Sequence, residues 1–146
     1  MKKILAIIAA AGIVSMAGVA MAATANLDVT AEVTPTCIMT GGTLDFANLD
    51  PTAPVIKTAV SAGVTITCTN DTAFTLSGDD GVNPVGTQKY LTNGTSDIPY
   101  SVTIPASGTG TGSAVAISIG GTIAAGSYAT ATAGSYTDTI ELTVTP

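Results

Sequence analysis

Cys37 and Cys68 are the two cysteines of this 146-residue chain and its best candidates for covalent chemistry. A redox-active pair would normally show the close Cys-x-x-Cys spacing, which these two residues lack. In an exported protein, an even pair of cysteines instead forms a structural disulfide. The sequence therefore predicts a disulfide between Cys37 and Cys68, which closes a loop of about 30 residues and stabilises the fold by roughly 3–4 kcal/mol.

Asp79, Asp80 and Asn83 lie in the Gly-rich segment GDDGVNPVGTQ (residues 78–88), where carboxylates could bind calcium or catalyse hydrolysis. Calcium requires six or more oxygen ligands in a set spacing, and the EF-hand loop pattern is absent. A glycosidase would need an apolar pocket to raise the pKa of one carboxyl group. We therefore expect solvated loop carboxylates, with no metal, no cofactor and no catalytic residue. A hydrolase that uses Asp79 or Asp80 is the alternative, which Asp→Asn substitutions would test.

The overall charge also restricts the classes of partner. The chain has no histidine, which removes the commonest general base and the commonest metal ligand. It has no arginine and four lysines against ten acidic residues. Such a chain has no basic patch for nucleic acid phosphates or anionic lipid headgroups. We expect neither a nucleic acid partner nor a small-molecule substrate.

The N-terminus has the three parts of a secretory signal peptide. Lys2 and Lys3 precede an apolar run over residues 4–14, and Ala20, Met21 and Ala22 fit the small-x-small cleavage rule. We predict a signal peptide over residues 1–22, with a retained transmembrane anchor as the alternative. Cleavage after Ala22 removes two lysines and leaves two against ten acidic residues, a net charge of −8.

Short strand-like segments recur through the rest of the chain, with turn residues between them. Alternating apolar and polar residues predict a strand leading from Val60 into Cys68, and further strands at residues 73–78, 89–92, 98–104 and 136–144. Residues 114–123 are expected to form one strand, or two joined at Gly120 and Gly121. Asn93 and Gly94 predict a hairpin turn, and Gly108 to Gly112 are expected to break the pattern. No window of helical length keeps a 3.6-residue period. Several short strands at this spacing predict an all-β sandwich.

The segment NLDVTAEV (residues 26–33) alternates strictly near the start of the exported chain. Leu27, Val29, Ala31 and Val33 are apolar, and the residues between them are polar. A period of two predicts a strand with one face to bury. On these residues alone it would be the first strand of its own closed sandwich, because most such segments pair within the chain.

The last predicted strand alternates in the same way and stops at Pro146. Ile140, Leu142 and Val144 are apolar, and Thr139, Glu141 and Thr143 are polar. A seven-stranded sandwich normally continues past such a strand to a final one. If that final strand is missing here, the sandwich is open along one edge, and an open edge of this kind can pair with another chain.

From Ala25 to its end, the chain resembles the spore coat protein U domain family, the pilin family of archaic chaperone–usher fimbriae. The matching motifs are the alternating segment before PTC (35–37), VTITCTN (64–70), SGDDGVN (77–83), GTGTGSAVAISIGGTI (108–123) and AGSYTDTIELTV (133–144). Two features depart from the family pattern: Gln88 and Lys89 replace a common Arg-Met pair, and the chain ends on Thr145 and Pro146 rather than on an aromatic residue.

The resemblance implies an incomplete immunoglobulin-like β-sandwich that lacks its final strand. It also implies donor-strand complementation, in which one chain adds a strand to the sheet edge of another. It implies a periplasmic chaperone that lends this strand first, an outer-membrane usher, and a neighbouring pilin, either a copy of this chain or a sibling. Leu27, Val29, Ala31 and Val33 would be the donor side chains. Ile140, Leu142 and Val144 would line the receiving groove or face the core.

The implied organisation is a signal peptide (1–22), an N-terminal donor-strand extension (23–34) and a pilin sandwich domain (35–146). The implied function is a non-enzymatic shaft subunit of a cell-surface pilus, for attachment and biofilm formation. One alternative keeps the same assembly but places the polymer in a secreted cell or spore coat. Another is a monomeric, exported β-sandwich binding module that is complete without a partner.

Overall fold

The structure is a computed structural model of the chain that describes residues 21–146. The expected signal peptide lies outside the described residues, except for Met21 and Ala22. Contacts divide the chain into one unit that ends at Glu32 and a second unit, Val33–Pro146. Residues 21–36 have no regular secondary structure, so every strand belongs to the second unit.

Ten strands and no helix make up the described residues, which confirms the prediction of an all-β fold. The strands are β1 (Cys37–Thr40), β2 (Lys57–Val60), β3 (Thr65–Cys68), β4 (Ala73–Gly78), β5 (Lys89–Thr92), β6 (Asp97–Thr103), β7 (Ser107–Thr109), β8 (Val115–Ala116), β9 (Gly120–Ile123) and β10 (Leu142–Thr145). From Met21 onward, the structure contains no helix long and apolar enough to cross a membrane.

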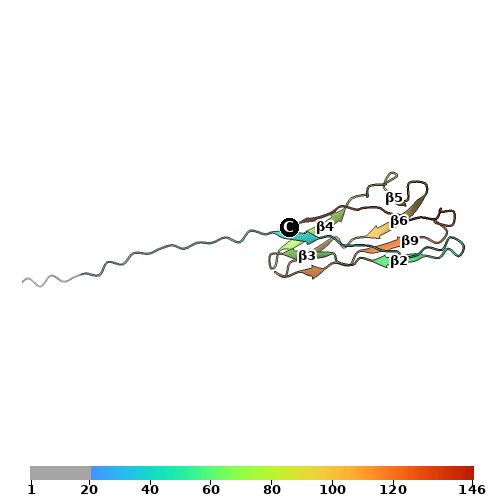
Figure 1. Cartoon of the computed structure of the whole chain (residues 1–146). Coiled ribbons are helices and arrows are strands. Elements are labelled where there is room, and N and C mark those ends of the chain that lie inside the picture. The colour runs from blue at the N-terminus through green and yellow to red at the C-terminus, as the bar shows by residue number, and fades with distance from the viewer. Residues whose placement is uncertain (1–20) are drawn as a thin grey trace, which may run out of the picture. The chain divides into compact units, whose positions relative to one another are not determined.

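The strands form three antiparallel sheets, in the orders β1-β3-β8, β10-β4-β7 and β2-β9-β6-β5 (Figure 1). The predicted hairpin is confirmed, because β5 and β6 pair through a turn at residues 93–96. The Asn93 side chain closes this turn by accepting hydrogen bonds from the backbone N–H groups of Thr95 (2.9 Å) and Ser96 (2.8 Å). Gly94 has a φ of 82°, a conformation in which glycine lacks the penalty of a Cβ.

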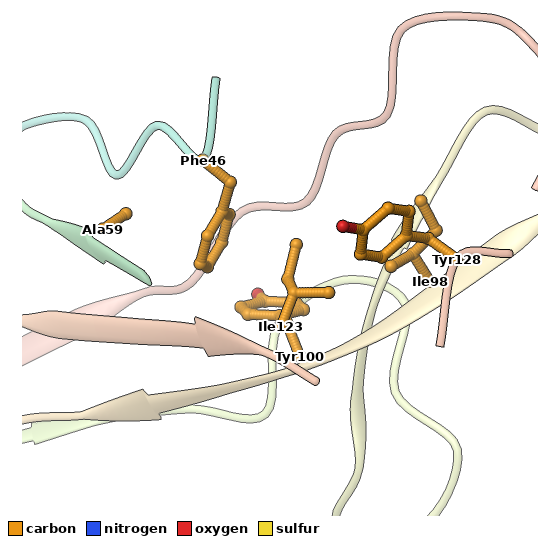
Figure 2. Close-up of a cluster of buried hydrophobic side chains, with 6 residues drawn as sticks. All are labelled: Phe46, Ala59, Ile98, Tyr100, Ile123 and Tyr128. Carbon is orange, nitrogen blue, oxygen red and sulfur yellow. The ribbon is translucent and has the colours of Figure 1, made fainter. Parts of the chain in front are cut away.

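One apolar cluster covers the four-stranded sheet. Figure 2 shows its six buried residues, Phe46, Ala59, Ile98, Tyr100, Ile123 and Tyr128. The rings of Phe46 and Tyr100 meet edge to face, with centroids 6.1 Å apart. The hydroxyl of buried Tyr128 bonds to both the N–H and the C=O of Val55, each at 2.8 Å. This side chain therefore fixes the segment before β2 to the core.

A second apolar cluster lies between the two three-stranded sheets. Ile66 and Cys68 of β3 are buried with Phe74 and Leu76 of β4. The predicted disulfide is present: Cys37 and Cys68 face each other in the β1–β3 ladder and their sulfur atoms are bonded. The disulfide thus ties the outer strand β1 to this core.

Four strand assignments differ from the sequence prediction. Residues 114–123 form two strands, β8 and β9, which belong to different sheets. The run from Val60 to Cys68 is two strands in two sheets, β2 and β3, because the chain bends at Gly63, whose φ is 83°. The expected break at residues 108–112 overlaps β7, where Gly108 leaves room for the Phe74 ring. The last strand begins at Leu142 rather than near Tyr136, since the residues before Leu142 lie beside a loop instead of a strand.

Candidate functional site

Two sheet edges lie next to each other without pairing. Within residues 21–146, β1 shares a ladder with β3 alone and β10 with β4 alone, yet β1 contacts β10. Beyond β1, Thr43 exchanges two backbone hydrogen bonds with Ala62 and so extends the first edge. Each edge therefore has a row of backbone N–H and C=O groups on its outer side.

The backbone of the last strand shows which groups are free to bind. Asp79 donates its N–H to the Glu141 carbonyl at 3.0 Å, so the backbone of Glu141 faces the β4 side. In an antiparallel ladder, successive residues point their backbone groups to opposite sides. The N–H and C=O groups of Ile140, Leu142 and Val144 therefore face β1 across the open edge.

A cavity of about 570 Å³ lies between the two edges, and we call it the groove. Its lining is mostly apolar, and it comes from both edges and from the sheets beneath them. The lining residues are Met39, Gly41, Gly42, Thr43, Leu44, Ser61, Val64, Tyr100, Val102, Ile119, Asp138, Thr139, Ile140 and Leu142. An apolar groove beside unpaired backbone groups can accept an extended segment with alternating apolar side chains.

Two of the three residues expected to receive a donor strand line this groove. Ile140, Leu142 and Val144 are partly buried, while Thr139, Glu141 and Thr143 between them are exposed. Ile140 and Leu142 contribute to the groove lining. Val144 packs instead against the cluster between the two three-stranded sheets. Whether these residues receive a donor strand remains a prediction.

Gly78 makes room for this part of the groove. It faces Leu142 in the β4–β10 ladder. A Cβ atom at this position would lie 2.6 Å from Ile104 Cδ1 and 3.0 Å from Ile140 Cγ2. Because neither distance is tolerated without movement, glycine lets these two aliphatic side chains meet above the backbone of β4.

One end of the groove is polar, which the sequence did not predict. The Asp138 carboxylate accepts hydrogen bonds from the Tyr100 hydroxyl (2.6 Å), the Val82 N–H (3.0 Å) and the Asn83 side chain (3.2 Å). Burial, and then this carboxylate, raise the pKa of Tyr100 well above its usual range. The available signal was the position of Asp138, two residues before Ile140 and so on the same face.

The carboxylates of the Gly-rich loop belong to exposed residues, as expected, and they also have defined partners within the chain. Asp79 accepts hydrogen bonds from the N–H groups of Gly81 (3.0 Å) and Glu141 (2.9 Å). Lys89 donates to the Asp79 carbonyl at 2.6 Å and forms an ion pair with Asp80 at 3.0 Å. In residues 21–146, no group of three acidic, cysteine or histidine side chains could hold a metal ion.

The four expected donor side chains are exposed. Leu27, Val29 and Ala31 belong to the unit that ends at Glu32, and Val33 begins the next. The exposed fractions of Leu27, Val29 and Val33 are 87%, 84% and 77%. Large apolar side chains at such exposure suit a segment that becomes buried on binding.

Comparison with known proteins places this all-β fold in a defined class. A family model, the Spore Coat Protein U domain, matches residues 23–143. The chain therefore belongs to the Spore Coat Protein U domain family, as its motifs predict. No curated protein matches the chain significantly.

A solved structure shares the fold. It is the CsuC–CsuE chaperone–tip adhesion subunit pre-assembly complex from the archaic chaperone–usher Csu pili of Acinetobacter baumannii. The similarity has a TM-score of 0.50 at 20% sequence identity, and it covers 77% of this chain. The chain spans 40% of the length of the chain that it matches.

Proposed function

We propose that this protein is a structural pilus subunit that polymerises by donor-strand exchange. The observation that carries the proposal is the apolar groove between the unpaired edges of β1 and β10. An edge of this kind promotes association with another chain unless something covers it. The cover in the polymer is the N-terminal segment of the next subunit.

The alternating segment at residues 26–33 has the pattern that the groove requires. Leu27, Val29, Ala31 and Val33 enter the groove of a neighbour, while Asp28 and Glu32 stay in water. Main-chain hydrogen bonds to the open edge supply affinity, and the alternate side chains set the register. A slip by one residue would bury Asp28 and Glu32 without partners, at a cost of several kcal/mol.

The proposal gives the chain three parts: a signal peptide (1–22), a donor-strand extension (23–34) and the sandwich domain (35–146). The signal peptide directs export to the periplasm. There a chaperone fills the groove with a strand of its own, and an outer-membrane usher then exchanges this strand for the segment of the next subunit. The product is a cell-surface fibre of this chain, or of this chain with sibling pilins, that serves attachment and biofilm formation. This role is structural and needs no catalytic residue.

The test is an unheated SDS gel of the periplasmic protein, co-expressed with a chaperone and an usher of the archaic class. Wild type is expected to give a ladder of multimers that heating collapses. Val29→Asp is expected to abolish the ladder, because the charge would enter the apolar groove. Thr30→Asp is the matched control, one residue along and on the solvated face, and it is expected to keep the ladder.

Two results would contradict the proposal. One is a stable, soluble monomer that forms no multimers even with the chaperone and the usher present, which would favour a self-complete binding module. The other is a ladder that survives Val29→Asp as well as it survives Thr30→Asp, which would show that the segment is not the donor.

A further inference from the structure

Asp138 begins the segment of residues 138–141 before β10, and Asp79 lies in the loop after β4. The carboxylate of each residue accepts hydrogen bonds from the other of these two parts of the chain. We propose that these two carboxylates form a clasp that keeps residues 138–141 extended as a ready-made edge for the incoming strand. Asp79 and Asp138 are positioning residues in this account, since they hold the edge in place, Asp138 from one end of the groove lining. The inference rests on the proposed strand exchange.

The clasp is reciprocal. From the loop, the Asp79 carboxylate accepts a hydrogen bond from the Glu141 N–H (2.9 Å), and the Asp79 N–H donates to the Glu141 carbonyl (3.0 Å). From the segment, the Asp138 carboxylate accepts hydrogen bonds from Val82 (3.0 Å) and Asn83 (3.2 Å) in the loop. Side-chain hydrogen bonds thus join the loop and the segment at both ends, and one backbone hydrogen bond, from Asp79 to Glu141, adds to them.

Gly81 shows how closely the two parts approach. Its φ is 85°, and a Cβ atom there would collide with the Asp138 carboxylate. Any other residue would therefore be strained and would also push the loop away from Asp138. Lys89 fixes the far side of the loop through the Asp79 carbonyl and the Asp80 carboxylate.

The clasp replaces a missing ladder. Thr137 bridges to Thr92, and β10 begins at Leu142, while residues 138–140 make no backbone–backbone hydrogen bond within the described part of the chain. Without another restraint, such a segment would sample many backbone conformations, and the donor would have to order it on binding. A segment that is already extended lowers this entropic cost and speeds productive encounter.

This role predicts different effects on the rate constants for association and dissociation of the donor segment. In the free acceptor, the clasp restrains residues 138–141 together with the packing of Ile140 against the core, so its loss slows association. In the bound state, the ladder with the donor also orders them, so dissociation changes little. Loss of a side chain that only stabilised the complex would instead raise the dissociation rate constant.

The experiment measures both rate constants by fluorescence anisotropy. The probe is a labelled synthetic peptide of residues 23–34. The acceptor is the exported full chain with Leu27→Asp and Val29→Asp, two exposed positions, so that its own segment cannot act as donor. Asp138→Asn is expected to slow association about tenfold and to change dissociation less than about twofold. Asn83→Ala removes one bond of the clasp and is expected to slow association about two- to threefold.

Asp97→Asn is the matched control. It makes the same change of charge at an exposed residue that begins β6, and it is expected to leave both rate constants unchanged. If Asp138→Asn fails to fold, the Asn83→Ala rates decide the matter. Peptide binding by the parent acceptor with unchanged association in both variants would overturn the clasp alone. An equal slowing in the Asp97→Asn control would overturn it too. No binding of the peptide to the parent acceptor would instead overturn the proposed strand exchange.

Discussion

At the scale of residues, the face on which a side chain lies decides more than its polarity whether it lines the groove. Asp138, Ile140 and Leu142 occupy one face of the chain before and within β10, and all three line the groove. The two aliphatic residues leave an apolar surface for a partner. Asp138 has three hydrogen-bond donors around its carboxylate, so its charge has partners at the groove's edge.

Tyr100→Phe is expected to lower the free energy of unfolding by about 1.5–3 kcal/mol at neutral pH, because it removes a hydrogen bond to a charged group. Urea unfolding of wild type and variant measures this difference. A difference below about 0.5 kcal/mol would show that the 2.6 Å contact between the Tyr100 hydroxyl and Asp138 contributes little net stability.

The same pair predicts the pH dependence of stability. Burial and Asp138 raise the pKa of Tyr100, so folding favours the protonated phenol. An unfolded tyrosine loses its proton near pH 10, so the stabilisation is complete below about pH 10 and declines as the pH rises toward the folded-state pKa. The gap in stability between wild type and Tyr100→Phe should therefore shrink above about pH 10. A gap that stays constant up to about pH 11 would contradict this.

Sequence could not pair these two residues. Tyr100 and Asp138 are 38 positions apart, and the alternation around each residue gives its face but not the side chain that it meets. Their contact depends on how β6 and the segment before β10 meet at the end of the groove. The alternation of residues 26–33 and of residues 139–144 could be seen in the sequence because it is a local property, and the donor and acceptor roles of these residues stay predictions.

At the scale of elements, the groove depends on where β1 and β10 are held. Alternation combined with turn residues predicted β4, β5 and most of β6, because both signals agree there. It merged β2 with β3 because the spacing from Val60 through Val64 to Ile66 remains even across the bend. It also extended β10 too far, because side chains can alternate where the backbone has no ladder partner.

The disulfide is expected to stabilise the edge at β1. Replacing both Cys37 and Cys68 with serine should lower the free energy of unfolding by about 3–4 kcal/mol on the chain-entropy model, for a sequence separation of 31 residues. Urea unfolding with and without reductant measures this loss. Hydrogen exchange should also become faster at the amide of Ile38 in β1, which faces Thr67 of β3 in the ladder. Unchanged exchange there, with a loss below about 1 kcal/mol, would show that β1 is held by packing alone.

At the scale of the whole molecule, charge should govern how fast subunits meet. The exported chain has two lysines against ten acidic residues, and Lys89 is already paired with Asp80. The donor segment itself carries Asp28 and Glu32. Like-charged subunits repel, and salt screens the repulsion over about 10 Å at 0.1 M.

Assembly of purified subunits should therefore accelerate several-fold between about 20 mM and 500 mM sodium chloride. The growth rate of the ladder on unheated SDS gels measures this dependence, and the unfolding midpoint at each salt concentration is the control for stability. Slower growth at high salt would point to an attractive charge pair between subunits.

The most direct test of donor-strand exchange is a cross-link between two differently tagged chains. One chain carries Val29→Cys, and the other carries Ile140→Cys or Leu142→Cys. Oxidation of the assembled mixture is expected to join the two tags through a disulfide, while Thr30→Cys in place of Val29→Cys should not. If residues 26–33 instead fold back into their own groove, a chain with Val29→Cys and Leu142→Cys together will form an internal disulfide and stay monomeric, which would contradict the account.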